Sequence, residues 1–439
     1  MATVRTITRR LSAAPPTVLT VYAMAVSFAV YFCMYAFRKP FTAAKFEGLS
    51  FLGSAVELKT ALVISQIIGY TLSKYLGIKV CSEATRGRRM FLLIALIVVA
   101  EAALLLFAVL PGGWKVIAIL LNGLPLGMVW GICVLYLEGR RTSELLLAGL
   151  SCSFILASGV VKDAGRALLN AGVSEDWMPV ATGGLFLPVF IVCVWLLDQM
   201  PNPTQQDIEA RTIRLPMGGA QRTGFFKRFL PGMILLMATY FFLTAYRDFR
   251  DNYGVEIFRS LGYEKTPAIF TMTELPVAFG VMASLAALNL VKDNRRGMMG
   301  AFAIMAGGAA MLGVGTLMLD AGWIDGATWM VLTGLGAYLA YVPFGSVLFD
   351  RLIASTRVTG TAVFAIYVAD AIGYTGSVAV QLYKDLGAQD TSRFTFFRWF
   401  TYAMSLGGFA MLTAAAVYFT SRRQAKDAQL PKPISVPAM

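Results

Sequence analysis

Long apolar stretches separated by short polar segments form the dominant pattern of this chain. A helix that crosses a bilayer needs about 20 consecutive, mainly apolar residues. Twelve stretches have about that length, and each predicts one transmembrane helix. They cover approximately residues 16–40, 56–78, 89–110, 114–138, 145–170, 178–199, 230–252, 266–291, 298–319, 326–349, 359–383 and 396–420. The pattern therefore predicts an all-α integral membrane protein with twelve transmembrane helices.

One polar segment, residues 201–229, is longer than the others and divides the twelve stretches into six and six. It contains several prolines and charged residues, which is typical of a linker. We therefore expect an N-terminal six-helix half (residues 1–200), this linker, a C-terminal six-helix half (residues 230–422) and a tail (residues 423–439). The linker and the tail are expected to be cytoplasmic.

The two predicted halves resemble each other in sequence. Leu121-Asn122-Gly123-Leu124 matches Leu332-Thr333-Gly334-Leu335, and Gly149 matches Gly360 at the same offset. Weak matches that keep their order along the chain indicate an internal repeat. Twelve helices in two related halves, joined by a basic linker, resemble the major facilitator superfamily. The resemblance implies that superfamily's fold of two pseudo-symmetric six-helix halves.

The composition of the 439-residue chain supports a membrane location. Hydrophobic residues make up 57% and charged residues only 14%, a balance that excludes a soluble globular protein of this length. The net charge is +13, but the basic residues lie in short segments between the apolar stretches. This distribution follows the positive-inside rule. It argues against nucleic-acid binding, for which one basic segment is typical.

The positions of Lys and Arg also predict the orientation. They are more frequent on the side that holds both termini and the linker, so both termini are expected in the cytoplasm. We expect a monomeric, multi-pass protein in the lipid bilayer of a bacterial inner (plasma) membrane. The sequence has no histidine, and its five cysteines show no CxxC spacing. We therefore expect reduced thiols, no metal site, no cofactor and no histidine proton relay.

Charged residues near or inside the apolar stretches are candidate functional residues, because a charge at membrane depth costs about 2.5–3.5 kcal/mol on insertion scales. Arg38 and Lys39 close the first stretch, in Tyr35-Ala36-Phe37-Arg38-Lys39. Ala245-Tyr246-Arg247 closes the seventh stretch in the same way. One such site in each half predicts a binding centre between the halves.

Further charges lie at comparable places. The cations are Lys74, Lys162, Arg166 and Arg250, and the acids are Glu101, Asp163, Asp248, Asp251, Glu274 and Asp370. Internal ion pairs are the structural alternative, above all Lys162 with Asp163, and Asp248 and Asp251 with Arg247 and Arg250. The alternative is weakest for Arg38 and Lys39, because no acid lies within one helical turn of them. For Glu101 we expect a structural role.

Converging guanidinium and ammonium groups suit an anion. Arg binds a carboxylate or a phosphate through two parallel hydrogen bonds, and Lys adds a point charge. We therefore expect a small anionic solute as the partner of this centre. The candidate substrate-binding residues are Arg38, Arg247, Lys39, Lys74, Lys162, Tyr35, Tyr70 and Arg250, with Tyr31, Tyr240 and Tyr246 as further candidate donors.

Several motifs resemble the organophosphate:phosphate antiporter family. Phe37-Arg38-Lys39-Pro40-Phe41 looks like its Arg-Lys-x-Phe signature, and Tyr70-Thr71-Leu72-Ser73-Lys74 looks like its Tyr-x-x-Ser-Lys motif. Residues 123–130 resemble the family's glycine-rich fourth helix, and Arg247 falls where the family has an arginine in the seventh helix. The resemblance implies exchange of a phosphate ester for phosphate. Arg38 and Arg247 would grip the phosphoryl group from opposite halves, assisted by Lys74 and Tyr70.

The chain departs from that family at several positions. Family members commonly carry a histidine in the fifth helix, where this chain offers Lys162 or Arg166. Glu274 and Asp370 lie in the eighth and eleventh stretches, and an acid inside the membrane is a candidate proton carrier. Proton-coupled symport of a carboxylate or a sugar acid is therefore an alternative. The chain is placed as a divergent relative.

The segment between the second and third stretches resembles the superfamily's cytoplasmic motif. Its charged residues are Glu83, Arg86, Arg88 and Arg89. We expect them to latch the inside gate through ion pairs.

The sequence thus favours a secondary active transporter, an antiporter of a small organic anion, that works by rocker-switch alternating access. A membrane sensor with a transporter-like fold, which binds the anion and signals to a partner, is a further alternative. An integral-membrane enzyme is not expected, because the sequence has no His/Cys metal cluster, no nucleophile elbow and no large extramembrane domain. No catalytic residue is assigned.

Overall fold

The computed structural model describes residues 2–137, 140, 142–204, 207, 227–349, 351–352 and 362–421. Twelve long helices account for most of these described residues. They are α2 (Pro16–Met34), α3 (Leu58–Glu83), α4 (Arg86–Val109), α5 (Lys115–Leu137), α6 (Ser143–Asn170), α7 (Met178–Asp198), α10 (Leu230–Asn252), α12 (Ile269–Asn289), α13 (Asn294–Asp320), α14 (Gly326–Pro343), α16 (Ala362–Gly387) and α17 (Arg393–Ser421). Each corresponds to one predicted apolar stretch.

Short helical segments complete the described structure. An N-terminal helix, α1 (Ala2–Ala13), precedes the bundle, and α11 (Gly254–Ser260) follows α10. The 3-10 segments are η1 (Tyr35–Phe37), η2 (Pro40–Ala43) and η3 (Gly112–Trp114), and the π-helical segment η4 (Phe344–Leu348) extends α14. Most of the predicted linker, 201–229, and the predicted tail, 423–439, lie outside the described residues.

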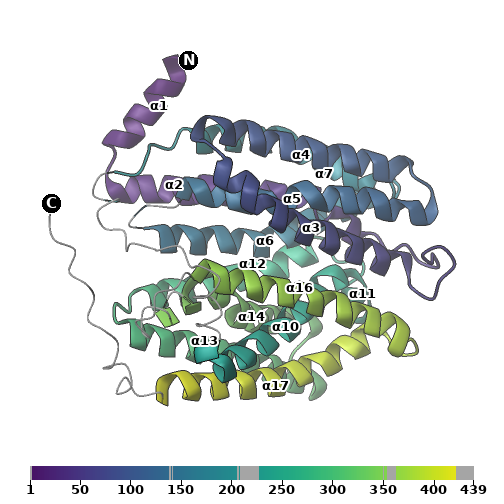
Figure 1. Cartoon of the computed structure of the whole chain (residues 1–439). Helices are drawn as coiled ribbons and strands as arrows, with labels where there is room; N and C mark the ends of the chain where they lie inside the picture. The colour runs from purple at the N-terminus through teal and green to yellow at the C-terminus, as the bar shows by residue number, and fades with distance from the viewer. Residues whose placement is uncertain are drawn as a thin grey trace.

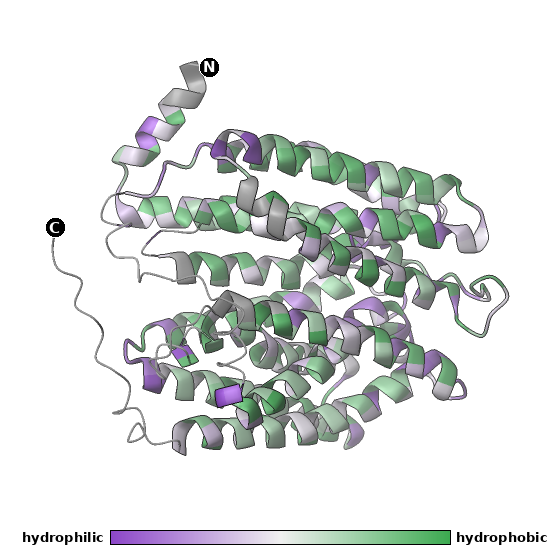
Figure 2. Cartoon of the chain, in the orientation of Figure 1, coloured by the Kyte–Doolittle hydropathy of each residue, from purple (hydrophilic) through white to green (hydrophobic). Residues whose placement is uncertain are grey.

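The helices have the length and surface of membrane spans. Within the described ranges, ten helices are long and apolar enough to cross a membrane. Large apolar side chains face outward, among them Phe91 (71% exposed) and Leu406 (75% exposed). Apolar residues run along the helices, and polar residues gather mainly towards helix ends (Figure 2). The protein is therefore a multi-pass membrane protein, and the predicted all-α membrane class is confirmed.

Two bundles of six helices form the molecule (Figure 1). Helices α2 to α7 share one core of buried apolar side chains, and α10 to α17 share a second. A smaller cluster joins them where α6 packs against α12, and α3 also packs against α16. The closest packing between the two halves is therefore that of α6 on α12 and of α3 on α16.

Glycines allow the closest helix contacts, as small residues do in membrane bundles. A Cβ at Gly69 would lie 2.3 Å from the carbonyl oxygen of Leu120, where α3 crosses α5. A Cβ at Gly159 would lie 2.8 Å from the carbonyl oxygen of Phe270, where α6 crosses α12. Any larger residue at either position would force the two backbones apart. The contact at Gly159 lies at the interface between the halves.

The first membrane helix breaks at the charged motif. Helix α2 ends at Met34, η1 continues to Phe37, and the backbone turns at Arg38 and Lys39 before η2 begins at Pro40. Carbonyl groups freed by the break need partners inside a membrane protein. Asn122 donates to the carbonyl of Phe37 (2.9 Å), and Gln66 donates to the carbonyl of Arg38 (2.8 Å). The predicted continuous span over residues 16–40 is thus an α-helix followed by an anchored irregular segment.

The bundle has two distinct ends. Helix α2 begins and α17 finishes at one end (Figure 1). We call the opposite end the distal end; it holds residues 44–57, 171–177, 253–268 and 388–392. Several polar contacts between the halves lie towards this end, and they are described below.

Candidate functional site

Arg38 is a buried cation held by aromatic rings. Its side chain lies beyond the end of α2, and the residue is 8% exposed. The guanidinium carbon lies 4.0 Å from the centroid of the Tyr70 ring and 5.6 Å from that of Tyr35, so cation–π contacts stabilise the charge. Among the residues that the structure describes, no carboxylate forms an ion pair with Arg38, and its buried Nε has no hydrogen-bond partner. Within the described part of the chain, this charge is therefore not compensated by an acid.

Arg247 of α10 is the counterpart of Arg38 in the other half. Its guanidinium carbon lies 4.1 Å from the centroid of the Tyr341 ring, and its Nη2 lies 2.7 Å from Oδ1 of Asp248. Tyr35 interacts electrostatically with both arginines. Each half therefore presents one arginine stacked on a tyrosine towards the shared interface.

Further tyrosines surround the two arginines. The hydroxyl groups of Tyr31 and Tyr70 lie 3.4 Å apart, and Tyr240 donates to the hydroxyl of Tyr341 (2.9 Å). The rings of Tyr70 and Tyr374 are 5.7 Å apart and bring α3 of one half against α16 of the other. Phenol hydroxyls and ring faces of both halves thus gather around the arginines.

Asp251 joins the halves through two lysines. Its Oδ2 lies 2.5 Å from Nζ of Lys39, and its Oδ1 lies 2.5 Å from Nζ of Lys162. Lys39 also donates to Asn252 (2.8 Å). Lys39 and Lys162 belong to the N-terminal half, whereas Asp251 lies at the end of α10. Sequence spacing left Lys39 without an acid, but the structure supplies one from the other half.

The pairing of Lys162 with Asp163, considered from the sequence, is wrong. Asp163 instead accepts hydrogen bonds from the amides of Phe270 (3.4 Å) and Thr271 (2.6 Å). These amides lie in the first turn of α12, where a carboxylate is favoured by unpaired N–H groups and by the helix dipole. Adjacent residues on a helix point in different directions, so Asp163 contacts α12 whereas Lys162 contacts α10.

Two further cations are paired with the proposed proton carriers. Nη1 of Arg250 lies 2.6 Å from Glu274, and its Nη2 donates to the carbonyl of Met330 (2.7 Å). The expected pairing of Arg250 with Asp251 is therefore replaced by a partner on α12. Oε2 of Glu274 is buried and has no hydrogen-bond partner in the described part of the chain.

Lys74 and Asp370 form the other pair and again link the halves. Nζ of Lys74 lies 2.6 Å from Oδ2 of Asp370, and Tyr240 donates to Oδ1 of the same carboxylate (2.8 Å). Lys74 also lies 5.5 Å from the centroid of the Tyr70 ring. Lys74 and Asp370 are thus both part of the wall around Arg38.

Two other sequence candidates lie away from this centre. Tyr246 is fully buried against Phe397, with ring centroids 5.0 Å apart, and its hydroxyl lies 3.1 Å from that of Thr401. It faces α17, so its expected role as a donor to the site is wrong. Glu101 lies against Gly183, where a Cβ would meet its Oε2 at 2.0 Å. It sits between α4 and α7 inside the N-terminal half.

The predicted gate residues lie where α3 ends and α4 begins. Arg86 donates to the carbonyl of Met200 and to Asn202, and Arg89 donates to the carbonyl of Leu135 (2.8 Å). Arg88 is exposed, and the side chain of Glu83 lies outside the described residues. These contacts attach the segment to α5 and to the residues after α7, and the latching role stays a prediction.

The described residues hold no group of three or more His, Cys, Asp or Glu side chains that could bind a metal ion. Cys33, Cys133, Cys152 and Cys193 are free thiols. The side chain of Cys81 is not among those that the structure describes. The chemistry available at the centre is therefore that of arginine, lysine, carboxylate and phenol groups.

Comparison with known proteins places the chain in a family. A family model described as a family of unknown function, DUF5690, matches residues 40–422. The chain belongs to the DUF5690 family. The match begins directly after Arg38 and Lys39 and covers every long helix from α3 to α17. No curated protein matches this DUF5690 chain.

Solved structures show which fold this DUF5690 protein has. A crystal structure of a mutant of the nucleoside transporter NupG matches with a TM-score of 0.58 and 12% identity, covering 91% of this chain and 100% of that chain. A crystal structure of a D-xylose-proton symporter matches with a TM-score of 0.59 and 13% identity, covering 91% of this chain and 96% of that chain. The predicted major facilitator fold, with two six-helix halves, is confirmed. Identities this low show the fold and nothing finer.

Sequence reasoning missed several residues of the centre. Tyr338, Tyr341 and Tyr374 interact electrostatically with Arg247, yet they were not among the candidates. Their signal was available, because all three tyrosines lie within apolar stretches of the C-terminal half. The role of Asp251 as a bridge between the halves had no sequence signal, since it depends on how the halves pack.

Proposed function

We propose that this DUF5690 protein is a secondary active transporter of a small organic anion that works by rocker-switch alternating access. The observation that carries the proposal is Arg38, a buried arginine without an acid partner in the described structure, which shares the interface between the halves with Arg247. Arginine forks recognise a carboxylate or a phosphate in two-point contact. The proposed location is a bacterial inner membrane, as a monomer with both termini cytoplasmic.

The charges around Arg38 favour an anion with more than one negative charge. Lys74, Arg247 and Arg250 each have one acid. Lys39 and Lys162 share Asp251, and Arg38 has no acid in the described structure. The centre thus carries two more cations than acids. This excess supports the choice of a phosphate ester, exchanged for phosphate, over a monocarboxylate.

Alternating access would use the contacts between the halves. Asp251 holds Lys39 and Lys162, and Asp370 holds Lys74, so the central ion pairs cross from one half to the other. An anion bound by Arg38 and Arg247 neutralises the excess positive charge and lets the halves close around it. An empty, positively charged centre resists this closure, which couples export of one anion to import of another.

Uptake by reconstituted vesicles tests the proposal. Vesicles loaded with phosphate should take up labelled phosphate or a phosphate ester when they contain the protein. Arg38→Lys and Arg247→Lys should abolish this uptake, because lysine cannot form the two parallel bonds. Arg398→Lys is the matched control, since Arg398 is 38% exposed and pairs with Asp320 at 3.4 Å. Uptake at the wild-type rate in both site variants would remove these arginines from the site, and no uptake of any anion would refute transport.

Proton-coupled symport is the second candidate. It is favoured by Glu274, whose Oε2 is buried without a hydrogen-bond partner in the described part of the chain. A symporter should acidify the vesicle lumen as the substrate enters, and Glu274→Gln or Asp370→Asn should stop that acidification. Uptake that needs internal phosphate and moves no protons would leave exchange as the mechanism.

A further inference from the structure

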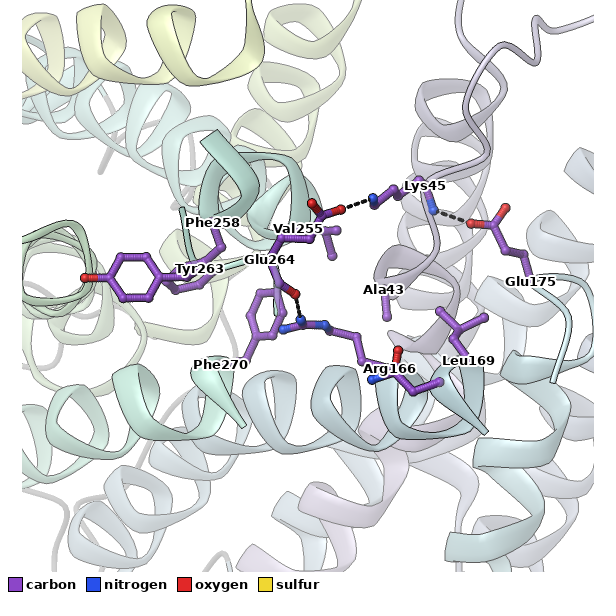
Figure 3. Close-up of a pocket in the computed structure, with 11 residues that line it drawn as sticks. Ala43, Lys45, Arg166, Leu169, Glu175, Val255, Phe258, Tyr263, Glu264 and Phe270 are labelled. Carbon is purple, nitrogen blue, oxygen red and sulfur yellow. Dashed lines mark hydrogen bonds and ion pairs between the residues drawn. The ribbon is translucent and has the colours of Figure 1, made fainter. Parts of the chain in front are cut away.

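A cavity lined by two basic and two acidic side chains opens at the distal end, between the halves. Its volume is about 280 Å³, close to the lower end of the range for small-molecule pockets. Lys45, Arg166, Asn170 and Glu175 line it from the N-terminal half, and Glu264 and Phe270 line it from the C-terminal half (Figure 3). The cavity is thus separate from the residues around Arg38 but lies on the same interface.

Three of the four charged groups in this cavity have charged or amide partners. Lys45 pairs through Nζ with the carboxylate of Glu264. The backbone amide of Lys45 donates to Glu175 (2.8 Å), and the amide of Phe46 donates to the same carboxylate (3.2 Å). Both acids of the cavity are therefore engaged.

Arg166 is the exception. Its Nη2 donates to the backbone carbonyl of Glu264, as Figure 3 shows, and its guanidinium carbon lies 5.6 Å from the centroid of the Phe270 ring. Within the described ranges it forms no ion pair. A guanidinium has five N–H donors, so Arg166 keeps donors for a ligand in the cavity.

The cavity lies next to the central site along α6. Arg166 follows Lys162 by one helical turn, a rise of about 6 Å, on the same face of the helix. One ring, that of Phe270, lies 5.0 Å from Nζ of Lys162 and 5.6 Å from the guanidinium carbon of Arg166. The cavity therefore lies directly beyond the bridge that Lys162 forms with Asp251, on the distal side.

We propose that this cavity is a vestibular anion-binding subsite. Arg166 would hold the carboxylate or phosphate group of an incoming solute before the Lys162–Asp251 bridge opens. The inference rests on the proposed function, because it assumes that the anion travels along α6 to Arg38 and Arg247. It adds a binding residue, Arg166, and a stage of binding that the central site does not provide.

A cysteine reporter tests the charge of the cavity without knowledge of the natural solute. Asn170 lines the cavity, is exposed, and lies four residues after Arg166 on the same face of α6. In the purified full-length Asn170→Cys variant, we compare the labelling rates of an anionic sulfonate reagent and a cationic thiol reagent. Adding Arg166→Gln should lower the anionic-to-cationic ratio up to about tenfold, because one unit charge at several ångströms in a water-like medium changes each labelling rate about threefold, in opposite directions.

Two variants control this measurement. Arg166→Lys should keep most of the ratio, because the charge is retained. Arg398→Gln should change it little, since Arg398 is 38% exposed, pairs with Asp320 (3.4 Å) and does not line the cavity. Protein without the new cysteine gives the background. A ratio that Arg166→Gln leaves unchanged would overturn the proposal.

Anion protection then tests binding itself. Inorganic phosphate or acetate should slow labelling of Asn170→Cys several-fold, and Arg166→Gln should remove this protection. Failure of both anions to protect, or equal protection without Arg166, would refute the subsite. Protection should persist with Arg38→Lys, which disables the central site. Protection without any anion uptake would uphold the subsite and refute transport. Arg38-dependent uptake without protection would uphold transport and refute the subsite.

Discussion

Two polar clusters join the halves, and they differ in charge balance. The central cluster around Arg38 and Arg247 has two more cations than acids. The distal cluster consists of Glu57, Lys59, Glu256, Lys384, Asp385 and Arg393, and has three of each. In it, Lys59 pairs with Glu256 (2.6 Å), and Arg393 pairs with Glu57 (2.6 Å) and Asp385 (3.4 Å).

This difference favours a closing role for the distal cluster and an anion-binding role for the central cluster in the proposed transporter. Lys59 and Arg393 each reach an acid in the other half, so the distal cluster is complete when the halves meet. The guanidinium carbon of Arg393 also lies 3.9 Å from the centroid of the Tyr253 ring, much as Arg38 lies over Tyr70. Both arginines use an aromatic face, but among the described residues Arg393 also has carboxylate partners whereas Arg38 has none. Matched charges favour a gate, and unmatched buried charges favour an anion site.

The largest expected effect comes from Arg38→Gln. Anion uptake should fall at least about a hundredfold, because a charged two-point contact made by a buried arginine is lost. Thermal stability should stay equal or rise, since the variant removes a buried charge that no acid compensates. Uptake assays check the first expectation, and the Tm of the purified protein checks the second. A fall in Tm together with normal uptake would make Arg38 a structural residue.

Lys59→Met should lower the stability of the protein, in contrast to Arg38→Gln. It leaves Glu256 without its cation, so the free energy of unfolding should fall by up to about 2 kcal/mol, less than for a fully buried pair because Glu256 is 23% exposed. We expect a Tm lower by a few degrees, and a double variant with Glu256→Leu should recover most of it. A Tm unchanged in the single variant would contradict the closing role of the distal cluster.

A smaller effect is expected at Tyr70, whose ring faces Arg38. Tyr70→Leu removes the cation–π contact, worth about 1–2 kcal/mol at a desolvated site, so the substrate KM should rise roughly fivefold to thirtyfold. Tyr70→Phe retains the ring and should stay within about twofold of wild type. An equal rise of KM in both variants would assign the effect to the hydroxyl group rather than to the ring.

The smallest effect is expected at the surface pair of Arg259 and Glu47. Their side chains are 50% and 63% exposed, Arg259 also lies 3.7 Å from the 45%-exposed Glu264, and such exposed pairs contribute at most about 1 kcal/mol each. Arg259→Gln should shift the Tm by about 1 °C or less and leave uptake unchanged. A large fall in the Tm or in uptake would show that the distal cluster also includes this exposed pair.

Much of the fold could be predicted because the bilayer imposes it. A span must be about 20 apolar residues long and must satisfy its own backbone, so apolar length alone located all twelve helices. The same rule identified Arg38 and Arg247, since charges at the end of an apolar stretch are conspicuous against it. It also placed one such arginine in each half.

Tertiary structure alone decided which charges are partnered. Sequence spacing shows neighbours within a helical turn, and so it suggested Lys162 with Asp163 and left Lys39 unpaired. In the structure both lysines reach Asp251, a residue of the other half. The sequence by itself thus determined the helices, the two halves and the position of one arginine at the end of an apolar stretch in each half. Packing between helices far apart in the chain decided that Arg393 is matched by acids while Arg38 is not.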